Sequence, residues 1–167
     1  MRRLRFALPL ALSVLFLDCT TKELAVRTLA PEHTPHAVAG NLLRFTLAYN
    51  REAAMSMPIG DHGRWPLVAV GVVIVAVLLR TLWRTPSGST WRRAALGLLI
   101  GGALGNLISR VQNPRGVVDF IDIGVGSWRF FLFNVADIAV CTGAFILALT
   151  IWLESKPSSR TPWFQPR

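Results

Sequence analysis

The chain has 167 residues, of which 52% are hydrophobic and 16% are charged, and its formal net charge at pH 7 is +9. Soluble domains carry about 25% charged residues, so this composition excludes an ordinary soluble domain and favours one membrane domain with length for about four spans. The basic residues stand at the ends of apolar runs, which is typical of membrane topology and not of a nucleic-acid-binding face.

The first apolar run predicts a membrane span over residues 6–29. Its basic start and Cys19 imitate a cleaved signal peptide, but Asp18 occupies the place where cleavage needs a small residue, so we expect a retained span. Asp18 and Lys22 are four residues apart with the acid first, the better order for a helical ion pair. The sequence leaves open whether they form a salt bridge near the helix end or belong to a functional site.

The next segment, residues 30–65, is polar and is expected on the outer side of the membrane. Between residues 42 and 49 apolar and polar side chains alternate, which predicts a half-buried strand in a small extramembrane platform. His33 and His36 are candidate metal ligands, but Pro35 separates them and no third ligand is near in the sequence, so we predict no metal site.

The second predicted span, residues 66–83, has no ionisable group before Arg80 and is expected to be scaffold. Short loops that are rich in arginine stay in the cytoplasm, so the loop after this span and the basic N-terminus are placed there. Both termini are then cytoplasmic, and residues 112–129 form a second outer segment. The C-terminal residues 155–167 are basic and rich in Pro and Ser, which predicts a disordered tail. The loop arginines are Arg80, Arg84, Arg92 and Arg93.

The third predicted span, residues 93–111, carries glycines at four-residue steps. Gly97, Gly101 and Gly105 lie on one helix face, where small residues let another helix backbone approach closely. Asn106 and Arg110 are also four apart on one face. The span is therefore expected to pack tightly and to present polar groups near its outer end.

The fourth predicted span, residues 130–153, contains Asn134 and Asp137. A carboxylate inside a membrane helix costs about 3 kcal/mol on insertion scales, so such acids are functional candidates. Three residues apart, Asn134 and Asp137 share a helix face. That stripe continues through Cys141, Ala144 and Ala148, so we expect this face to point into the bundle and away from lipid.

The polar residues of the predicted spans are expected at similar depths in the membrane. With a rise of 1.5 Å per residue, Asp18 lies roughly 18 Å and Asn106 about 20 Å from the inner face. Asp137 lies roughly 10 Å below the outer surface, and Asp119 is close to this layer in the adjoining loop. All of them fall in the outer third of the membrane, so the predicted site faces outward.

Two carboxylates at close range cannot both ionise, so one keeps a proton while the other stays anionic. Asp119 and Asp137 could therefore act as an aspartyl-protease dyad, oriented by Asn106, Arg110 and Asn134. A small transporter that uses Asp18, Asp119 and Asp137 to bind cations or relay protons is the alternative. The absence of an obvious internal repeat argues against it. An inert assembly subunit would leave the paired acids unexplained.

Five short motifs follow one another between Asp18 and Asp137, and in this order they resemble the lipoprotein signal peptidase (signal peptidase II) family of bacterial membrane aspartic proteases. The motifs are Asp18 with Thr21 and Lys22; Asn50 with Ala53 and Ala54; Gly101 to Ile108 with Arg110; Val118, Asp119 and Phe120; and Phe133, Asn134, Val135, Ala136 and Asp137.

The resemblance implies an all-α polytopic membrane protein with four transmembrane helices and a small β-platform on the outer, periplasmic side of the bacterial inner membrane. It implies cleavage of prolipoproteins before a diacylglyceryl-modified cysteine, with Asp119 and Asp137 as the catalytic dyad. No metal or organic cofactor is implied. We expect a monomer that meets its lipid-modified substrates and membrane lipids, and no nucleic acid. Substrate binding or support of the dyad falls to Asp18, Lys22, Asn50, Gly105, Asn106, Arg110 and Asn134.

The sequence departs from the family pattern at two positions. Glu52 stands where the family usually has glycine, which affects the expected loop after Asn50. Ser109 stands where the family usually has aspartate, which removes a possible partner for Arg110. Neither departure touches the proposed dyad.

Overall fold

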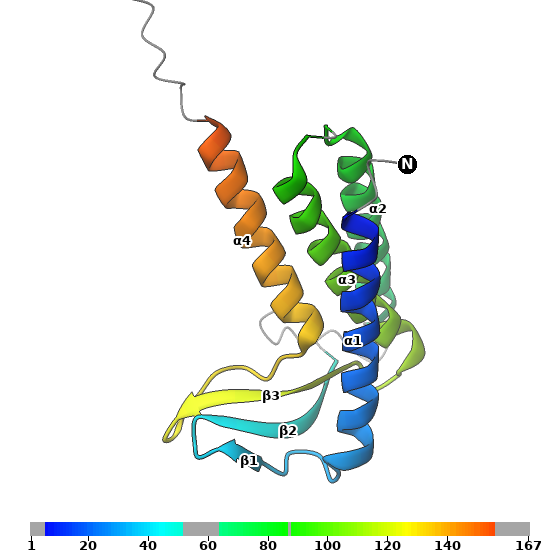
Figure 1. Cartoon of the computed structure of the whole chain (residues 1–167). Coiled ribbons are helices and arrows are strands. Elements are labelled where there is room, and N and C mark those ends of the chain that lie inside the picture. Colours follow the sequence, from blue (N-terminus) through cyan, green and yellow to red (C-terminus); the bar gives the residue numbers. More distant parts are fainter. Residues whose placement is uncertain (1–5, 52–63, 87, 156–167) are drawn as a thin grey trace, which may run out of the picture.

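The computed structural model describes residues 6–51, 64–86 and 88–155. Its helices form a bundle, and its short strands form a sheet at one end of that bundle (Figure 1). Glu52 and the predicted disordered tail, apart from Ser155, lie outside the described residues. In chain order the elements are α1 (Ala7–Thr28), β1 (His36–Ala39), β2 (Leu43–Asn50), α2 (Arg64–Arg84), α3 (Thr90–Gln112), β3 (Val117–Val125), β4 (Trp128–Arg129) and α4 (Val135–Ser155).

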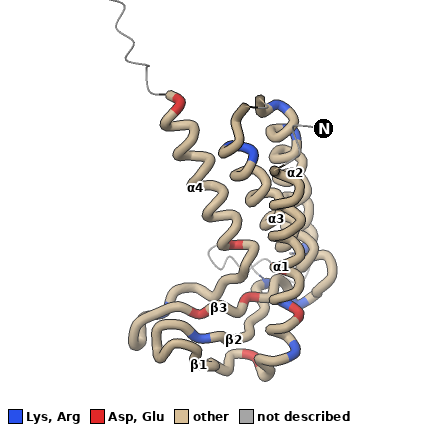
Figure 2. The backbone as a smooth tube through the Cα atoms, in the orientation of Figure 1, with Lys and Arg blue, Asp and Glu red and all other residues tan. Residues whose placement is uncertain are grey.

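Within the described part of the chain, three helices are long and apolar enough to cross a membrane: α2, α3 and α4. The charged positions gather toward the ends of the helices and around the sheet, and the middle of α4 is free of them (Figure 2). The helix α1 has 22 residues, and its second half carries Asp18, Lys22, Glu23 and Arg27. The expected helical membrane protein with a small antiparallel sheet is thus confirmed.

The helix α3 is the centre of the bundle and packs against α1, α2 and α4. A Cβ on Gly97 would come within 2.7 Å of the carbonyl oxygen of Ala7, and one on Gly101 within 2.7 Å of the carbonyl oxygen of Ala11. The predicted close approach along the glycine face is therefore confirmed, and α1 is the helix that lies there. Leu96 and Ile100 complete the core of this contact.

The sheet has the strand order β1-β2-β3-β4 and is antiparallel throughout. The strand β2 confirms the strand predicted for residues 42–49. The neighbouring strand β3 lies in the segment expected to be a loop. Its first four residues are all buried, so the alternation that marks a half-exposed strand is missing from its sequence. In the register of β2 and β3, Ala48 faces Asp119 and Asn50 faces Val117.

The helix α4 begins at Val135, whereas the sequence pattern placed the start of the span at residue 130. The residues before it are extended: Phe133 and Ile121 exchange backbone hydrogen bonds of 2.9 and 3.2 Å. Hydropathy cannot distinguish an apolar extended segment from the helix that follows it. The predicted inward stripe is wrong beyond Asn134 and Asp137. Cys141, Ala144 and Ala148 are exposed, while the buried residues of α4 are Ala136, Ala139 and Gly143.

Candidate active site

The first turn of α4 is closed by a reciprocal pair of hydrogen bonds between Asn134 and Asp137. The backbone N–H of Asp137 donates to Oδ1 of Asn134 at 3.1 Å, and the backbone N–H of Asn134 donates to Oδ2 of Asp137 at 3.1 Å. This is the geometry of a capping box, in which two otherwise unpaired helix donors are satisfied. A negative charge in the first turn is also favoured by the helix dipole. The two residues therefore hold each other in place.

The same Asn134 side chain also contacts the second acid, Asp119. Its Nδ2 donates to Oδ1 of Asp119 at 2.7 Å and lies 3.3 Å from the carbonyl oxygen of Val118. From the end of β2, Nδ2 of Asn50 donates to Oδ2 of Asp119 at 3.2 Å. Asn134 is fully buried and Asp119 is 4% exposed. One asparagine thus connects the carboxylates of β3 and α4, although they belong to different elements.

The helix α3 contributes Asn106 to the opposite side of Asp137. Its Nδ2 donates to Oδ1 of Asp137 at 2.8 Å, and its Oδ1 accepts from Nζ of Lys22 at 2.9 Å. The same oxygen lies 3.2 Å from Nδ2 of Asn134. The Asn106 amide is therefore oriented by a cation and an amide donor on one side, so that its N–H points at the carboxylate of Asp137.

Asp18 and Lys22 form a buried ion pair of 2.7 Å, and Asp18 is completely inaccessible to solvent. The second carboxylate oxygen, Oδ1, accepts the backbone N–H of Ala136 at 2.9 Å. Asp18 thus satisfies another donor at the start of α4 and ties α1 to that helix. Through Lys22, this pair is also joined to Asn106 and so to the hydrogen bonds around the two acids. A Cβ on Gly105 would collide with Oδ2 of Asp18, so the pair depends on that glycine.

Arg110 lies on the same face of α3 as Asn106, to whose carbonyl oxygen it donates at 3.3 Å. Its guanidinium interacts electrostatically with both Asp119 and Asp137. The adjacent Ser109 donates its hydroxyl to the carbonyl oxygen of Gly105 at 3.0 Å, which satisfies the side chain within its own helix. Arg110 therefore adds positive potential beside the acids.

The two acids do not have equal environments. Burial, and then the negative charge of Asp137, raise the pKa of Asp119 to about 6, against the lowering effect of Asn50, Asn134 and Lys22. Loss of water penalises the charged form of a carboxyl, and a second carboxylate adds to that penalty. Asp119 can therefore hold a proton close to neutral pH.

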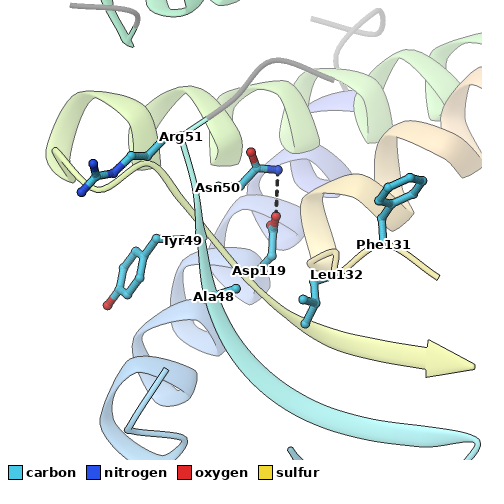
Figure 3. A pocket seen from close by; sticks show the side chains of 7 residues that line it. All are labelled: Ala48, Tyr49, Asn50, Arg51, Asp119, Phe131 and Leu132. Atoms are coloured by element: carbon cyan, nitrogen blue, oxygen red, sulfur yellow. Dashed lines mark hydrogen bonds between the residues drawn. The ribbon is translucent and has the colours of Figure 1, made fainter. Parts of the chain in front are cut away.

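A cleft of about 350 Å³ opens beside Asp119. In Figure 3 the carboxyl of Asp119 points at the amide of Asn50, and Phe131 and Leu132 lie on the opposite side of Asp119 from Tyr49 and Arg51. The remaining lining comes from Ala48 and Tyr49 of β2 and from Arg51, which follows that strand. Asp119 thus borders a cleft of mixed lining, apolar at Phe131 and Leu132 and polar at Asn50 and Arg51.

The network includes backbone groups that carry no sequence signal: the carbonyl of Val118 and the N–H of Ala136. Asp122, the other acid of β3, lies outside it. In a strand, residues three apart point to opposite faces. Asp122 instead pairs with Arg129 at 2.8 Å. No group of three or more His, Cys, Asp or Glu side chains that could hold a metal lies among the described residues.

The fold and the site define a helical membrane protein with a two-carboxylate centre where its bundle meets a small sheet. Residues 10–153 match the family described as Signal peptidase (SPase) II. The chain belongs to this family, as the motifs predicted.

Curated proteins with similar sequences belong to the same family. The lipoprotein signal peptidase of Mycolicibacterium smegmatis is 43% identical over 151 residues, which cover 87% of this chain and 60% of that protein. The lipoprotein signal peptidase of Coxiella burnetii (strain Dugway 5J108-111) is 38% identical over 154 residues, 90% of this chain and 91% of that protein. These similarities support a membrane signal peptidase and do not favour the transporter alternative.

Solved structures show the same fold. A bacterial membrane enzyme determined by the in meso method at 1.9 Å resolution aligns with a TM-score of 0.78 and 26% identity, covering 90% of this chain and 94% of the other. A second bacterial membrane enzyme, at 2.3 Å resolution, aligns with a TM-score of 0.83 and 24% identity over 93% and 92% of the two chains. The predicted class of bacterial membrane protein is thereby confirmed.

Proposed function

We propose that this chain is an aspartic endopeptidase that removes the signal peptide of diacylglyceryl-modified prolipoproteins, cutting before the lipid-bearing cysteine, with Asp119 and Asp137 as its catalytic dyad. The observation that carries the proposal is that one buried residue, Asn134, hydrogen-bonds both carboxylates: its side-chain Nδ2 donates to Asp119 and its backbone N–H donates to Asp137. Family membership and relatives named lipoprotein signal peptidase support the substrate class.

In the proposed reaction Asp119 enters protonated and Asp137 enters as the carboxylate, in keeping with the raised pKa of about 6 at Asp119. Asp137 removes a proton from a water molecule, and the water oxygen attacks the scissile carbonyl carbon. Asp119 gives its proton to the carbonyl oxygen, so the intermediate is a neutral gem-diol. When the C–N bond breaks, Asp137 protonates the leaving nitrogen and a hydroxyl proton returns to Asp119.

The surrounding groups have distinct roles in this proposal. The amides of Asn50 and Asn134 orient Asp119, and that of Asn106 orients Asp137. Arg110 is the candidate for binding a substrate carbonyl, because its charge faces both acids. Support comes from the ion pair of Asp18 and Lys22, which anchors the start of α4 and needs the space left by Gly105.

We place α1 in the membrane with α2, α3 and α4, so that both termini are cytoplasmic and the sheet lies on the outer side. Such an arrangement brings the dyad to the outer surface, where a diacylglyceryl anchor would present the bond next to its cysteine. The protein would act as a monomer among membrane lipids. A reporter fused after Arg167 should read as cytoplasmic, and an external signal would contradict this topology.

The substrate assignment is tested with the purified protein in detergent and one prolipoprotein prepared with and without its diacylglyceryl group. We expect cleavage of the modified precursor only, with a new N-terminal cysteine identified by mass spectrometry. Cleavage of the unmodified precursor at the same rate would contradict recognition of the lipid. Absence of cleavage in both would contradict the proposed activity.

A further inference from the structure

The turn that joins α3 to β3 contains a buried glycine in a conformation that other residues rarely adopt. Gly116 has φ +105°, in the left-handed region. Its N–H donates to the carbonyl oxygen of Asn113 at 3.0 Å, and Oδ1 of Asn113 accepts the N–H of Arg115 at 2.9 Å. The turn is thus closed by both the backbone and the side chain of Asn113.

Gly116 lies directly against the backbone of Asn50. A Cβ at this position would lie 2.5 Å from the carbonyl carbon of Asn50 and 2.8 Å from the nitrogen of Arg51, and it would overlap the carbonyl oxygen of Asn50. These are backbone atoms, so a change of rotamer cannot relieve the overlap. A side chain at this position must therefore push apart the end of β2 and the start of β3.

The end of β2 is where Asn50 donates to Asp119. The hydrogen bond of 3.2 Å from its side-chain amide to Oδ2 of Asp119 is one of the interactions that favour the charged carboxylate. The other polar and charged groups that face Asp119 are Asn134 and Asp137 at the start of α4, Lys22 of α1 and Arg110 of α3. Arg110 lies in the last turn of α3, three residues before Asn113, and the others belong to α1 and to the start of α4, so none of them is carried by β2.

We infer that Gly116 is a positioning residue: the absence of a side chain seats the backbone of Asn50 so that its amide reaches Asp119. The inference rests on the proposed dyad. A shift of β2 by a few tenths of an ångström already weakens a bond of 3.2 Å, because hydrogen bonds lose strength steeply with distance and angle. Gly116 therefore acts on the reaction without touching substrate.

The expected effect of Gly116→Ala has a direction that a general loss of stability would not produce. Without the Asn50 bond, the pKa of Asp119 moves further above its ordinary value, since that bond lowers it. The shared proton is then lost at higher pH, so the basic limb of the pH–rate profile for kcat moves upward. A lost hydrogen bond to a charged group should also lower kcat by about 10- to 100-fold.

The experiment compares Gly116→Ala with Asn50→Ala and the double variant, using cleavage of the lipid-modified prolipoprotein between pH 4 and 9. Gly126→Ala is the matched control. Gly126 also has a positive φ, +60°, but a Cβ there would meet nothing within 4 Å. We expect Gly116→Ala and Asn50→Ala to shift the basic limb upward, the double variant to equal Asn50→Ala, and Gly126→Ala to keep the wild-type profile. Residues that act through one another are non-additive in this way.

If Gly116→Ala does not fold, Asn113→Ala replaces it. That change removes the side-chain acceptor of the turn without adding atoms near Asn50, so a smaller upward shift is expected. Unchanged pH profiles in the folded variants, or full additivity with Asn50→Ala, would overturn the inference. If the wild-type protein does not cleave the substrate, the proposed function fails first, which separates the two outcomes.

Discussion

Replacing Asp119 with asparagine tests the environment of this acid apart from catalysis. Burial and Asp137 raise the pKa of Asp119 to about 6 in the folded protein, from the ordinary value of 3.8. A group whose pKa is raised on folding binds its proton more tightly in the native state, so wild-type stability falls as pH rises from 3.8 through 6. The asparagine variant has no such titration.

The magnitude follows from the same two values. A carboxyl pKa of about 6 against 3.8 corresponds to about 3 kcal/mol, fully expressed above pH 7 and absent below pH 3. The free energy of unfolding of Asp119→Asn minus that of wild type should therefore become more positive by up to about 3 kcal/mol across this window. For a chain of this length, that is a change in relative Tm of about 6–12 °C.

The assay is thermal unfolding in detergent at a series of pH values from 3 to 8. Because only the change with pH is used, any constant effect of altered hydrogen bonding cancels. Asp122→Asn on the same strand is the control: Asp122 pairs with Arg129, so its replacement removes a favourable interaction and should give no such rise. A difference between Asp119→Asn and wild type that is constant or falls with pH would refute a pKa raised by burial.

Three further substitutions have definite outcomes. Asn134→Ala removes the cap of α4 and a bond to Asp119, so we expect about 1 kcal/mol less stability in thermal unfolding and no detectable cleavage; near-wild-type turnover would contradict the role of Asn134. Gly105→Ala drives a methyl group into Asp18 and should destabilise the protein by about 1–3 kcal/mol, measured the same way; an unchanged Tm would show that the contact can relax. Asp122→Asn should retain substantial cleavage, because Asp122 is directed away from the site; its complete inactivation would mean that the wrong acid of β3 was chosen.

Periodic features of the fold could be predicted from the sequence. Glycines at four-residue steps in α3 indicated close packing, and α1 lies on that face. The alternation in residues 42–49 indicated β2. The strand β3 could not be found in this way, because Val117 to Phe120 are buried on both sides of the sheet. Alternation of apolar and polar residues marks a strand with one buried and one exposed face, and Val117 to Phe120 have no exposed face.

The residues of the candidate site could be selected from the sequence, but the hydrogen bonds that join them could not. The motif order brought together Asp119, Asp137 and their polar neighbours. Treating Asn134 as a residue inside a helix concealed its function as the cap, and with it the reason that one residue hydrogen-bonds both carboxylates, one through its side chain and the other through its backbone N–H. The contribution of Gly116 depends on a single backbone angle and one contact with Asn50, neither of which spacing along the chain can reveal.

The central claim is that Asp119 and Asp137 together cut a peptide bond. The most direct measurement is single-turnover cleavage of a diacylglyceryl-modified prolipoprotein by wild type, Asp119→Asn and Asp137→Asn, each checked for folding by its thermal unfolding. Asparagine keeps an acceptor oxygen at either position but cannot exchange the proton. We predict that both variants fold and that neither cleaves. Cleavage at a substantial fraction of the wild-type rate by either variant would contradict the dyad.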